Sequence, residues 1–580
     1  MKQENAPLPK NFEARVQDLI YNVDIGLGSL LIKGGLYLFM VLAIMSLYWL
    51  SEFWGLKHDV AMDQAQVARQ IMADGSFSTK NIRPAAIWLF EQHGADGRAL
   101  MLRQPDIVHP PVYPWLLSRL YKMMGDAFDP GRQVRAFPPE QWAIVPFGNV
   151  CALLTGLVLF LLARRFFEPR IALLAATLYF VSEVVWANST SGLSVSLAGL
   201  WTILAVYSAL LTVERRNEAA AGGPVHAWLL PALATALFCG LAFLTRYSAG
   251  WVAVLVGVTW AFLIPRNGWK FSLGLLAAVA LIASPWVIRN LQVCGQPFGL
   301  TPYLALNFNE GGVTHSFERQ VTPSFENVGR NLQAKWLTNL ADFYETALPA
   351  AGNGIVVALF ITTFFFRFSR PHVQVLRFGL LAAMIGLLLV AGLFGEETAR
   401  TFLIFWPLVI CYGLSFFYLL LDRMQVTIPI IRAGLMALMI ALTALPLIFT
   451  LLPPRSGYPY PPYFPSYITI VTPMLNQDEL LCTDMPWATA WYGDRSSLLL
   501  PVTIEEFYRI NDIKKRISGV YFTSLTRDLP YVRSLATGPF NSWYPIFREM
   551  IPLDFPLTEA FFIGNRDQLF LTDRPRWPQR

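Results

Sequence analysis

Residues 143–163 read AIVPFGNVCALLTGLVLFLLA, an apolar stretch without a single charged side chain. A helix of about 20 such residues spans the hydrocarbon core of a bilayer, which is roughly 30 Å thick. Arg164 and Arg165 follow directly, and basic residues of this kind are typical of the cytoplasmic end of a membrane span. The stretch therefore predicts a transmembrane helix rather than a core helix of a soluble domain.

Ten further apolar blocks of similar length occur along the chain. We expect eleven membrane spans in total, near residues 33–54, 143–163, 170–187, 193–213, 228–246, 248–265, 271–288, 354–370, 378–395, 401–421 and 429–452. The 580 residues are 54% hydrophobic and 14% charged, whereas soluble domains carry about 25% charged residues. This composition excludes a soluble enzyme, a disordered chain, a coiled coil and a disulfide scaffold. The predicted fold class is a polytopic α-helical membrane protein.

Lysine and arginine are distributed unevenly between the two sides of these spans. If the N-terminus is inside, the short inner loops hold Arg164, Arg165, Arg170, Arg215, Arg216, Arg266, Lys270, Arg367, Arg370, Arg377, Arg423 and Arg432. The short outer hairpins hold Arg246 and Arg400. Short cytoplasmic loops are enriched in basic residues, so we expect residues 1–32 to be cytoplasmic and block 33–54 to be an uncleaved signal anchor. The net charge of +6 reflects this bias rather than affinity for nucleic acid, and the short loops favour a bacterial inner membrane.

Three longer segments then face the outer side, either as loops of the transmembrane domain 33–453 or after it. They are residues 55–142, 289–353 and 454–580. In the last of them, strand-like stretches at 480–483, 496–501 and 517–523 alternate with helix-like ones, and Thr503 with Glu506 forms a capping box. This alternation predicts a small extracytoplasmic α/β domain. It lacks a glycine-rich phosphate loop, so we expect a lid or a recognition module.

The first outer segment carries the most informative polar pattern. It begins HDVAMDQAQVARQIMADG at residues 58–75 and predicts a short amphipathic helix ending near Gly75. Asp59 and Asp63 are four residues apart, so they share one face of that helix. Two carboxylates close to the membrane surface are suited to general-base catalysis or to cation binding. The alternative is that they only complement the dipole at the N-terminus of the helix.

Three arginines break the positive-inside pattern at the predicted outer ends of spans. Arg246 and Arg400 lie in short outer hairpins, and Arg289 follows the seventh span. A guanidinium fork suits phosphate oxygens, so we hypothesise that these residues bind the phosphate of a lipid-linked substrate. The alternative is that they extend to the lipid headgroups of the membrane.

Other polar residues are weaker candidates for the same site. Glu183 lies within the third predicted span, where a charge is costly and often functional. Glu397 lies close to Arg400, where it is placed to contact a substrate hydroxyl. Four histidines in the outer segments offer metal ligands, namely His58, His93, His109 and His315. Their spacing matches no metal motif, so a divalent cation is an alternative and no cofactor is expected.

Several motifs, in their order along the spans, resemble those of a known family. They are Asp63 within DQAQVARQIMADG, the proline pair Pro110–Pro111 after His109, LTRYSAGW at 244–251, SPWVIRN at 284–290 with GQPFG at 295–299, and ARTFLIFWP at 399–407. Together they resemble the GT-C membrane glycosyltransferases, in particular the superfamily of protein O-mannosyltransferases and aminoarabinose transferases. The resemblance covers roughly residues 33–450.

This resemblance implies a reaction and its partners. The donor would be a sugar on a polyprenyl phosphate, and the acceptor would be a lipid, a glycan or a protein on the outer side of the membrane. Transfer would invert the anomeric centre, with Asp63 as the general base. The chain departs from the family pattern at Gln64, where a glutamate is usual, and at His109, where the aminoarabinose enzymes have a Glu-Lys pair. The family resemblance therefore names neither the sugar nor the acceptor.

Two other classes of protein are alternatives to a glycosyltransferase. A transporter or flippase of lipid-linked saccharides predicts inverted repeats and charge pairs inside the membrane, and neither is evident in the sequence. A receptor or scaffold leaves the placement of Asp63 and the arginines unexplained. The predicted function is therefore lipid-linked glycosyl transfer.

Overall fold

The computed structural model describes most of the chain. It covers residues 27–124, 137–224, 226–307, 314–325, 328–347, 354–368, 370–394, 397–425, 428–452, 465–527, 535–564 and 566–577. Most of the predicted cytoplasmic segment 1–32 and most of the linker that begins the segment 454–580 lie outside these residues. The chain divides into two units, Met1–Phe53 and Trp54–Arg580, which are described separately below.

The first unit contains one described helix, α2 (Leu27–Glu52). It matches the first predicted span, at 33–54. Its large apolar side chains are exposed, among them Leu36, Phe39 and Leu50. Exposed leucines and phenylalanines along a whole helix indicate a surface that faces lipid.

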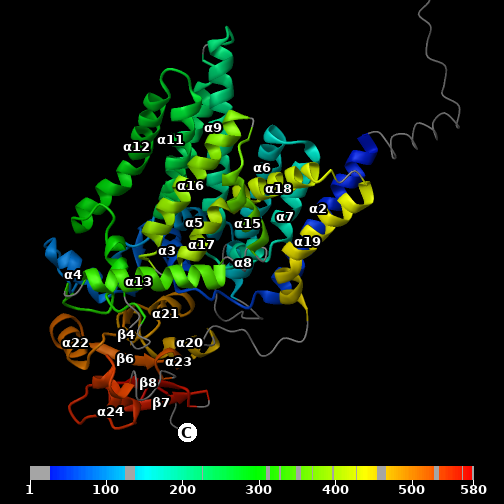
Figure 1. Cartoon of the computed structure of the whole chain (residues 1–580). Coiled ribbons are helices and arrows are strands. Elements are labelled where there is room, and N and C mark those ends of the chain that lie inside the picture. Colours follow the sequence, from blue (N-terminus) through cyan, green and yellow to red (C-terminus); the bar gives the residue numbers. More distant parts are fainter. Residues whose placement is uncertain are drawn as a thin grey trace, which may run out of the picture. The chain divides into compact units, whose positions relative to one another are not determined.

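The second unit contains the remaining apolar helices (Figure 1). They are α6 (Val145–Phe166), α7 (Pro169–Val181), α8 (Glu183–Thr190), α9 (Val195–Ala220), α10 (Leu229–Thr245), α11 (Trp251–Leu263), α12 (Gly268–Cys294), α15 (Ile355–Thr362), α16 (Pro371–Ala391), α18 (Trp406–Arg423) and α19 (Pro429–Leu451). Every one of the eleven predicted segments thus coincides with an apolar helix or helix pair of the described chain.

Not every one of these helices is long enough to cross a membrane alone. Seven of the described helices meet both length and composition requirements, and the pair α7 and α8 forms one further, broken candidate. The helices 229–245, 247–263 and 355–365 are apolar but shorter. The described chain therefore has seven or eight candidate membrane-spanning helices, and the number of eleven spans stays a prediction.

The third predicted span, 170–187, is not a single straight helix. It breaks at Ser182, whose backbone is extended, and α7 and α8 are bent by 56° relative to each other. Glu183 is the first residue of α8. The sequence contains no proline at the break to announce it, because Pro169 lies at the start of α7 instead.

The segment after Trp54 folds into three short helices and three small strands, one of which joins a larger sheet described below. The helices are α3 (Asp59–Asp74), α4 (Pro84–Gln92) and α5 (Val112–Met124), and β1 (Ser78–Thr79) pairs antiparallel with β3 (Gln104–Pro105). The predicted end of α3 is confirmed, because Gly75 adopts a left-handed conformation with φ of 80° and its N–H bonds to the Ile71 carbonyl. Glycine adopts this conformation without steric cost. The second predicted outer segment contributes η5 (Thr301–Leu306) and α13 (Val328–Asp342).

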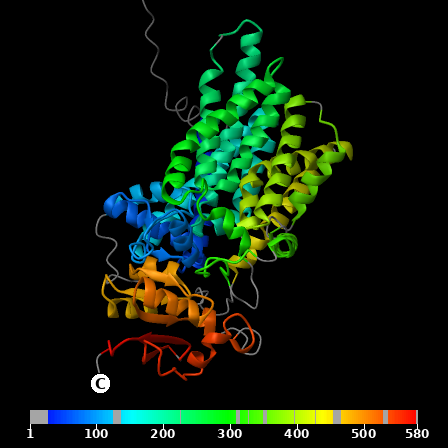
Figure 2. The same cartoon turned by 90° about the vertical axis from the view of Figure 1, so that its left-hand side faces the viewer.

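A six-stranded sheet lies near the C-terminus (Figure 2). Its order is β2 (Asn81–Ile82), β5 (Ser497–Leu499), β4 (Leu480–Thr483), β6 (Ile517–Phe522), β8 (Gln568–Thr572) and β7 (Glu559–Ile563). The first four strands are parallel and the last two are antiparallel. The three strand-like stretches predicted after residue 453 are present. The edge strand β2 comes from the segment between the first two predicted spans, which was not predicted from the sequence.

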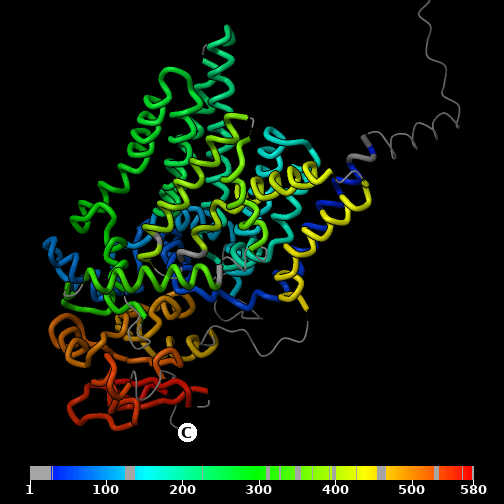
Figure 3. Tube along the Cα trace, in the orientation of Figure 1, coloured from blue at the N-terminus to red at the C-terminus, as the bar shows by residue number. Residues whose placement is uncertain are grey.

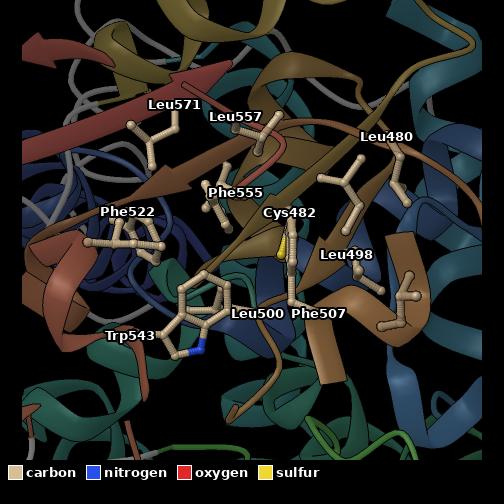
Figure 4. Close-up of a cluster of buried hydrophobic side chains, with 14 of the residues drawn as sticks. Leu480, Cys482, Leu498, Leu500, Phe507, Phe522, Trp543, Phe555, Leu557 and Leu571 are labelled. Carbon is tan, nitrogen blue, oxygen red and sulfur yellow. The ribbon is translucent and has the colours of Figure 1, made fainter. Parts of the chain in front are cut away.

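The sheet has its own apolar core (Figure 4). Leu480 and Cys482 from β4 meet Leu498 from β5 there, and Trp543 and Phe555 cover them. The helix α22 (Ile504–Tyr508) adds Phe507 to this core, and its N-cap Thr503 accepts a hydrogen bond from the Glu506 N–H at 3.3 Å, as the capping box predicts. Alternating inward side chains and a capped helix are sufficient to bury this layer.

Contacts at one end of the sheet connect it to α3. The helix α21 (Pro486–Gly493) packs against α3, and Lys80 forms an ion pair with Asp494 at 2.8 Å. The Trp491 indole donates to Glu140 Oε1 at 2.7 Å, just before α6. Figure 3 traces the chain through this region. These contacts favour a fixed support for α3 over a freely moving lid.

Candidate active site

Four carboxylates and three basic side chains meet around the start of α3. They come from α3 itself, the N-cap of α4, the loop after β3 and the loop after η5. We call this set the Asp63 cluster; it consists of Asp59, Asp63, Arg83, Asp106, His109, His315 and Glu318. Its members are distant in sequence, so the fold alone brings them together.

Asp63 lies at the centre of the cluster and its residue is 1% exposed. Arg83 forms an ion pair with its Oδ2, and the Gln66 amide donates to Oδ1 at 3.0 Å. The Nε2 of His109 lies 3.6 Å from Oδ2. A buried carboxylate needs such partners, because an unpaired charge costs several kcal/mol when it leaves water. These partners hold the Asp63 carboxylate in one orientation.

Arg83 connects two carboxylates and was not predicted as a site residue. Besides pairing with Asp63, its Nε donates to Glu318 Oε1 at 2.6 Å. Burial disfavours its charge, but the attraction of Asp63 and Glu318 outweighs burial and raises the pKa of Arg83 above its ordinary value. The available sequence signal was a lone arginine within the otherwise apolar stretch NIRPAAIWLF, at residues 81–90.

His315 forms a second bridge within the cluster. Its Nε2 lies 2.9 Å from Asp59 Oδ2, and its Nδ1 lies 2.6 Å from Glu318 Oε2. Burial favours the neutral ring, but the two carboxylates outweigh it and raise the pKa of His315 to about 9. His315 therefore stays cationic at neutral pH and joins the first predicted outer segment to the second. The ion pairs of His315 differ from the metal-ligand alternative that the sequence offers for this residue.

His109 is oriented by Asp106. The distance between His109 Nδ1 and Asp106 Oδ2 is 3.0 Å, and Asp106 also accepts the backbone N–H of Val108 at 3.1 Å. Burial opposes protonation, yet the attraction of Asp106 and Asp63 raises the pKa of His109. Because Asp106 engages Nδ1, the other ring nitrogen faces Asp63. The proline pair that follows, Pro110–Pro111, fixes the backbone after the ring, as expected.

Arg289 is next to this cluster. Its Nη1 donates to the Asp106 carbonyl at 2.5 Å and its Nη2 donates to the Phe77 carbonyl at 3.1 Å. Its guanidinium carbon lies 4.7 Å from the Trp286 ring centroid. Arg289 thus belongs to α12 and lies beside Asp106, the partner of His109; its role in binding a phosphate stays a prediction.

The other two candidate arginines converge on α17 (Glu397–Phe402). Arg246 is buried, and its Nε donates to Thr401 Oγ1 at 2.9 Å, which links the motifs 244–251 and 399–407. Burial lowers the pKa of His58 to about 4, and the positive charge of the nearby Arg400 contributes to this shift. His58 directly precedes Asp59, so Arg400 also lies close to the cluster.

Two predicted acids do not enter the contacts described above. Glu183 is half-buried in the first turn of α8, at the bend in the third predicted span. Glu397 begins α17, and its side chain lies outside the described part of the chain. Within the described residues, no group of three His, Cys, Asp or Glu side chains is arranged to hold a metal ion. Asp63 and Glu318 share one cationic partner, which is the guanidinium of Arg83.

The charge of His315 predicts a pH dependence of stability. The pKa of His315 is about 9 in the folded protein against 6.5 in a free side chain, so its ion pairs stabilise the fold fully below pH 6.5. This stabilisation, at most about 3 kcal/mol, is lost as the pH rises through 9. We expect the thermal midpoint in detergent to fall between pH 6.5 and pH 9. In the variant His315→Asn, which tolerates the left-handed φ of 58°, that fall should shrink; an unchanged fall would contradict the assignment.

The sequence matches no protein-family model and no curated relative, but the fold matches solved structures. The archaeal oligosaccharyltransferase AglB from Archaeoglobus fulgidus, in complex with an inhibitory peptide and a dolichol-phosphate, is similar with a TM-score of 0.54 and 12% identity, over 93% of this chain and 74% of that chain. ArnT from Cupriavidus metallidurans, bound to undecaprenyl phosphate, has a TM-score of 0.53 and 12% identity, over 94% of this chain and 99% of that chain.

These similarities define the class of fold. Both neighbours are GT-C glycosyltransferases, so the chain has the GT-C fold. The family resemblance noted in the sequence is confirmed at this level.

Proposed function

We propose that the protein is a membrane glycosyltransferase that transfers a sugar from a polyprenyl-phosphate donor to a hydroxyl acceptor on the outer side of the membrane. The fold supports this proposal, and both neighbours were solved with a polyprenyl phosphate bound. The observation that carries it is a buried carboxylate, Asp63, paired with Arg83 in a cluster that Arg289 joins to the end of an apolar helix.

In the proposed reaction, Asp63 is the general base. The acceptor oxygen attacks the anomeric carbon of the sugar while its proton passes to the Asp63 carboxylate. The bond between that carbon and the phosphate oxygen breaks, and the phosphate leaves as an anion with the bonding electrons. A single displacement of this kind inverts the anomeric centre. Such base catalysis contributes typically about 10²–10⁴-fold to a rate.

The arginines are proposed to stabilise the departing phosphate. Arg289 and Arg400 lie close to the cluster from two different elements, so the head of a lipid donor would meet fixed positive charge beside Asp63. Charge placed where an anion develops lowers the barrier without reorganisation. Arg246 reaches the same region through Thr401. Glu183 and Glu397 remain candidates for contacts with the acceptor.

The remaining cluster residues are positioning residues in this proposal. Arg83 and His315 pair with Asp63, Asp59 and Glu318, and they connect two predicted outer segments. His109 is placed to exchange a proton with Asp63 at 3.6 Å. No observation in the described part of the chain favours the transporter alternative. The localisation in a bacterial inner membrane, with the cluster on the periplasmic side, is part of the proposal.

The decisive experiment follows the lipid carrier. Cells with and without the protein would be compared by mass spectrometry of their polyprenyl-phosphate lipids, and the purified protein would be given the lipid pool of the deficient cells. We expect a lipid-linked sugar to accumulate without the protein, and the purified protein to release free polyprenyl phosphate from it when acceptor is present. Identical lipid pools with no release would refute glycosyl transfer.

Removal of the Arg400 guanidinium should weaken donor binding. A hydrogen bond to a charged group contributes about 1.5–3 kcal/mol, so Arg400→Ala should lower the affinity for undecaprenyl phosphate by about 10- to 100-fold. Titration of the purified protein with this lipid would measure the change. Arg215→Ala is the control, because Arg215 is an exposed residue at the end of α9 that pairs with Glu218. Wild-type affinity in the Arg400 variant would remove Arg400 from the phosphate site.

A further inference from the structure

A hollow in the protein lies away from the Asp63 cluster and is lined by none of its residues. It has a volume of about 1060 Å³ and opens where α6 and α18 end and where α7, α16 and α19 begin. Among them, α7 packs against α6, α18 and α19, and Figure 1 shows α6, α7 and α18 side by side. The volume is at the upper end of that of ordinary ligand pockets, which is about 300–1,000 Å³.

The two helices that end at this hollow begin close to the candidate active site. The helix α6 has 22 residues and follows Glu140, which binds Trp491, and α18 has 18 residues and follows Arg400 and Thr401. At 1.5 Å per residue they are about 33 Å and 27 Å long, which is close to the thickness of the hydrocarbon core. The hollow therefore belongs to the leaflet opposite the Asp63 cluster.

The walls of the hollow are largely apolar. Phe167, Ile171, Leu419 and Met436 contribute to them. On the lipid-facing surface of a membrane protein, such a hollow is filled by whatever the bilayer offers, and a bilayer offers acyl chains. An elongated apolar chain therefore makes more apolar contacts with these walls than a small soluble molecule does.

Charged groups at the rim decide which headgroup fits. Three arginines and two carboxylates face the hollow, namely Arg170, Arg370, Arg432, Glu168 and Asp422. Arg432 is paired with Asp422 at 2.8 Å, so these two charges largely cancel. Arg370 donates a hydrogen bond from Nη1 to the Phe166 carbonyl at 2.6 Å. Within the described residues, its Nε and Nη2 groups stay available for a ligand.

Arg170 is the rim arginine with the most hydrogen-bond donors available to a ligand. It is exposed, and its guanidinium makes no hydrogen bond or ion pair within the residues that the structure describes. Glu168 is the one acid at the rim that forms no ion pair within the described residues, so two arginines, Arg170 and Arg370, face one carboxylate. The charged residues at the mouth of the hollow thus have a net positive charge, and the rest of its lining is mainly apolar.

We propose that this hollow binds an anionic glycerophospholipid of the leaflet opposite the Asp63 cluster. Arg170 and Arg370 hold the headgroup phosphate, and an acyl chain lies over Ile171, Leu419 and Met436. Basic pockets between membrane helices are suited to anionic lipid headgroups, and guanidinium forks to phosphate oxygens. The bound lipid joins α7, α16, α18 and α19 at one end. This site is independent of the proposed glycosyl transfer.

Native mass spectrometry of the purified protein tests the site. The protein would be exposed to equal amounts of phosphatidylglycerol and phosphatidylcholine in detergent. We expect wild type to retain phosphatidylglycerol several-fold more than phosphatidylcholine, and the double variant Arg170→Gln/Arg370→Gln to retain both equally. Arg215→Gln, which removes a basic residue at the end of α9, should keep the preference. Equal retention of both lipids by wild type would overturn the proposal.

A second variant covers the case in which the double variant does not fold. Met436→Trp places a larger side chain in the hollow and should lower retention of phosphatidylglycerol without removing any charge. A phosphatidylglycerol with a photoreactive acyl chain should label residues 166–171 and 415–436 of wild type, and this label should fall in Met436→Trp. Labelling confined to other helices would overturn the assignment.

Two competitors identify the ligand among phosphate compounds. Inorganic phosphate at millimolar concentration should leave the bound phosphatidylglycerol in place, because it cannot replace the apolar contacts. Undecaprenyl phosphate should compete no better than phosphatidylglycerol does. Displacement by inorganic phosphate would make this a plain anion site, and strong displacement by undecaprenyl phosphate would make it a carrier site; either outcome contradicts the proposal.

Discussion

Replacement of Asp63 by asparagine should reduce glycosyl transfer by at least about 100-fold, the lower limit of what a general base contributes. The amide has nearly the same shape as the carboxylate but cannot take a proton from the acceptor. Donor affinity should remain within a few-fold of wild type, because the proposed phosphate contacts come from Arg289 and Arg400. The measurements are single-turnover transfer and equilibrium binding of undecaprenyl phosphate.

A matched control lies at the other end of the same helix. Asp74 closes α3 and pairs with Arg103 near the surface, where the two side chains are 43% and 36% exposed. Asp74→Asn should leave transfer unchanged, because an exposed ion pair contributes about 0–1 kcal/mol. If Asp63→Asn transferred sugar at the wild-type rate, Asp63 would not be the base. If it lost donor binding as well, Asp63 would have a role in binding rather than in proton transfer.

The membrane architecture could be predicted from the sequence because its cause is local. An apolar block long enough to span the bilayer is visible in the sequence itself, and each block from 33–54 to 429–452 coincides with an apolar helix. Asp63 and His109 could be chosen as candidates for a related reason, since each lies in a polar motif beside the start of a helix, but their roles stay predictions. The bend at Ser182 could not, because no proline or glycine marks it and the packing of α7 and α8 determines it.

The rest of the cluster depends on contacts between distant segments. Arg83 and Glu318 are 235 positions apart, and the stretch around Glu318 has neither periodicity nor a motif. The strand β2 is two residues long and pairs in parallel with β5, so that Asn81 lies opposite Ser497. Two residues are too few for an alternating pattern. That pairing leads directly into Arg83, so the sheet fixes the residue that neutralises Asp63.

Arg83 should therefore be the residue whose loss costs the most stability. Arg83→Met removes the cation between Asp63 and Glu318 and leaves both carboxylates buried and less compensated. Removal of one partner from a buried ion pair costs about 3–5 kcal/mol, so we expect a markedly lower thermal midpoint in detergent. Arg103→Met, which breaks the exposed pair with Asp74, should cost less than about 1 kcal/mol.

The double variant Arg83→Met/Glu318→Gln separates the charge effect from loss of packing. If uncompensated charge causes the instability, neutralising Glu318 should restore part of the thermal midpoint, because one of the two stranded carboxylates is removed. If lost packing causes it, the second substitution should add a further loss, since Glu318 also pairs with His315. Additive destabilisation would therefore refute a charge-balanced cluster. Partial rescue would show that Arg83 supplies the cation that allows Asp63 to be buried as an anion.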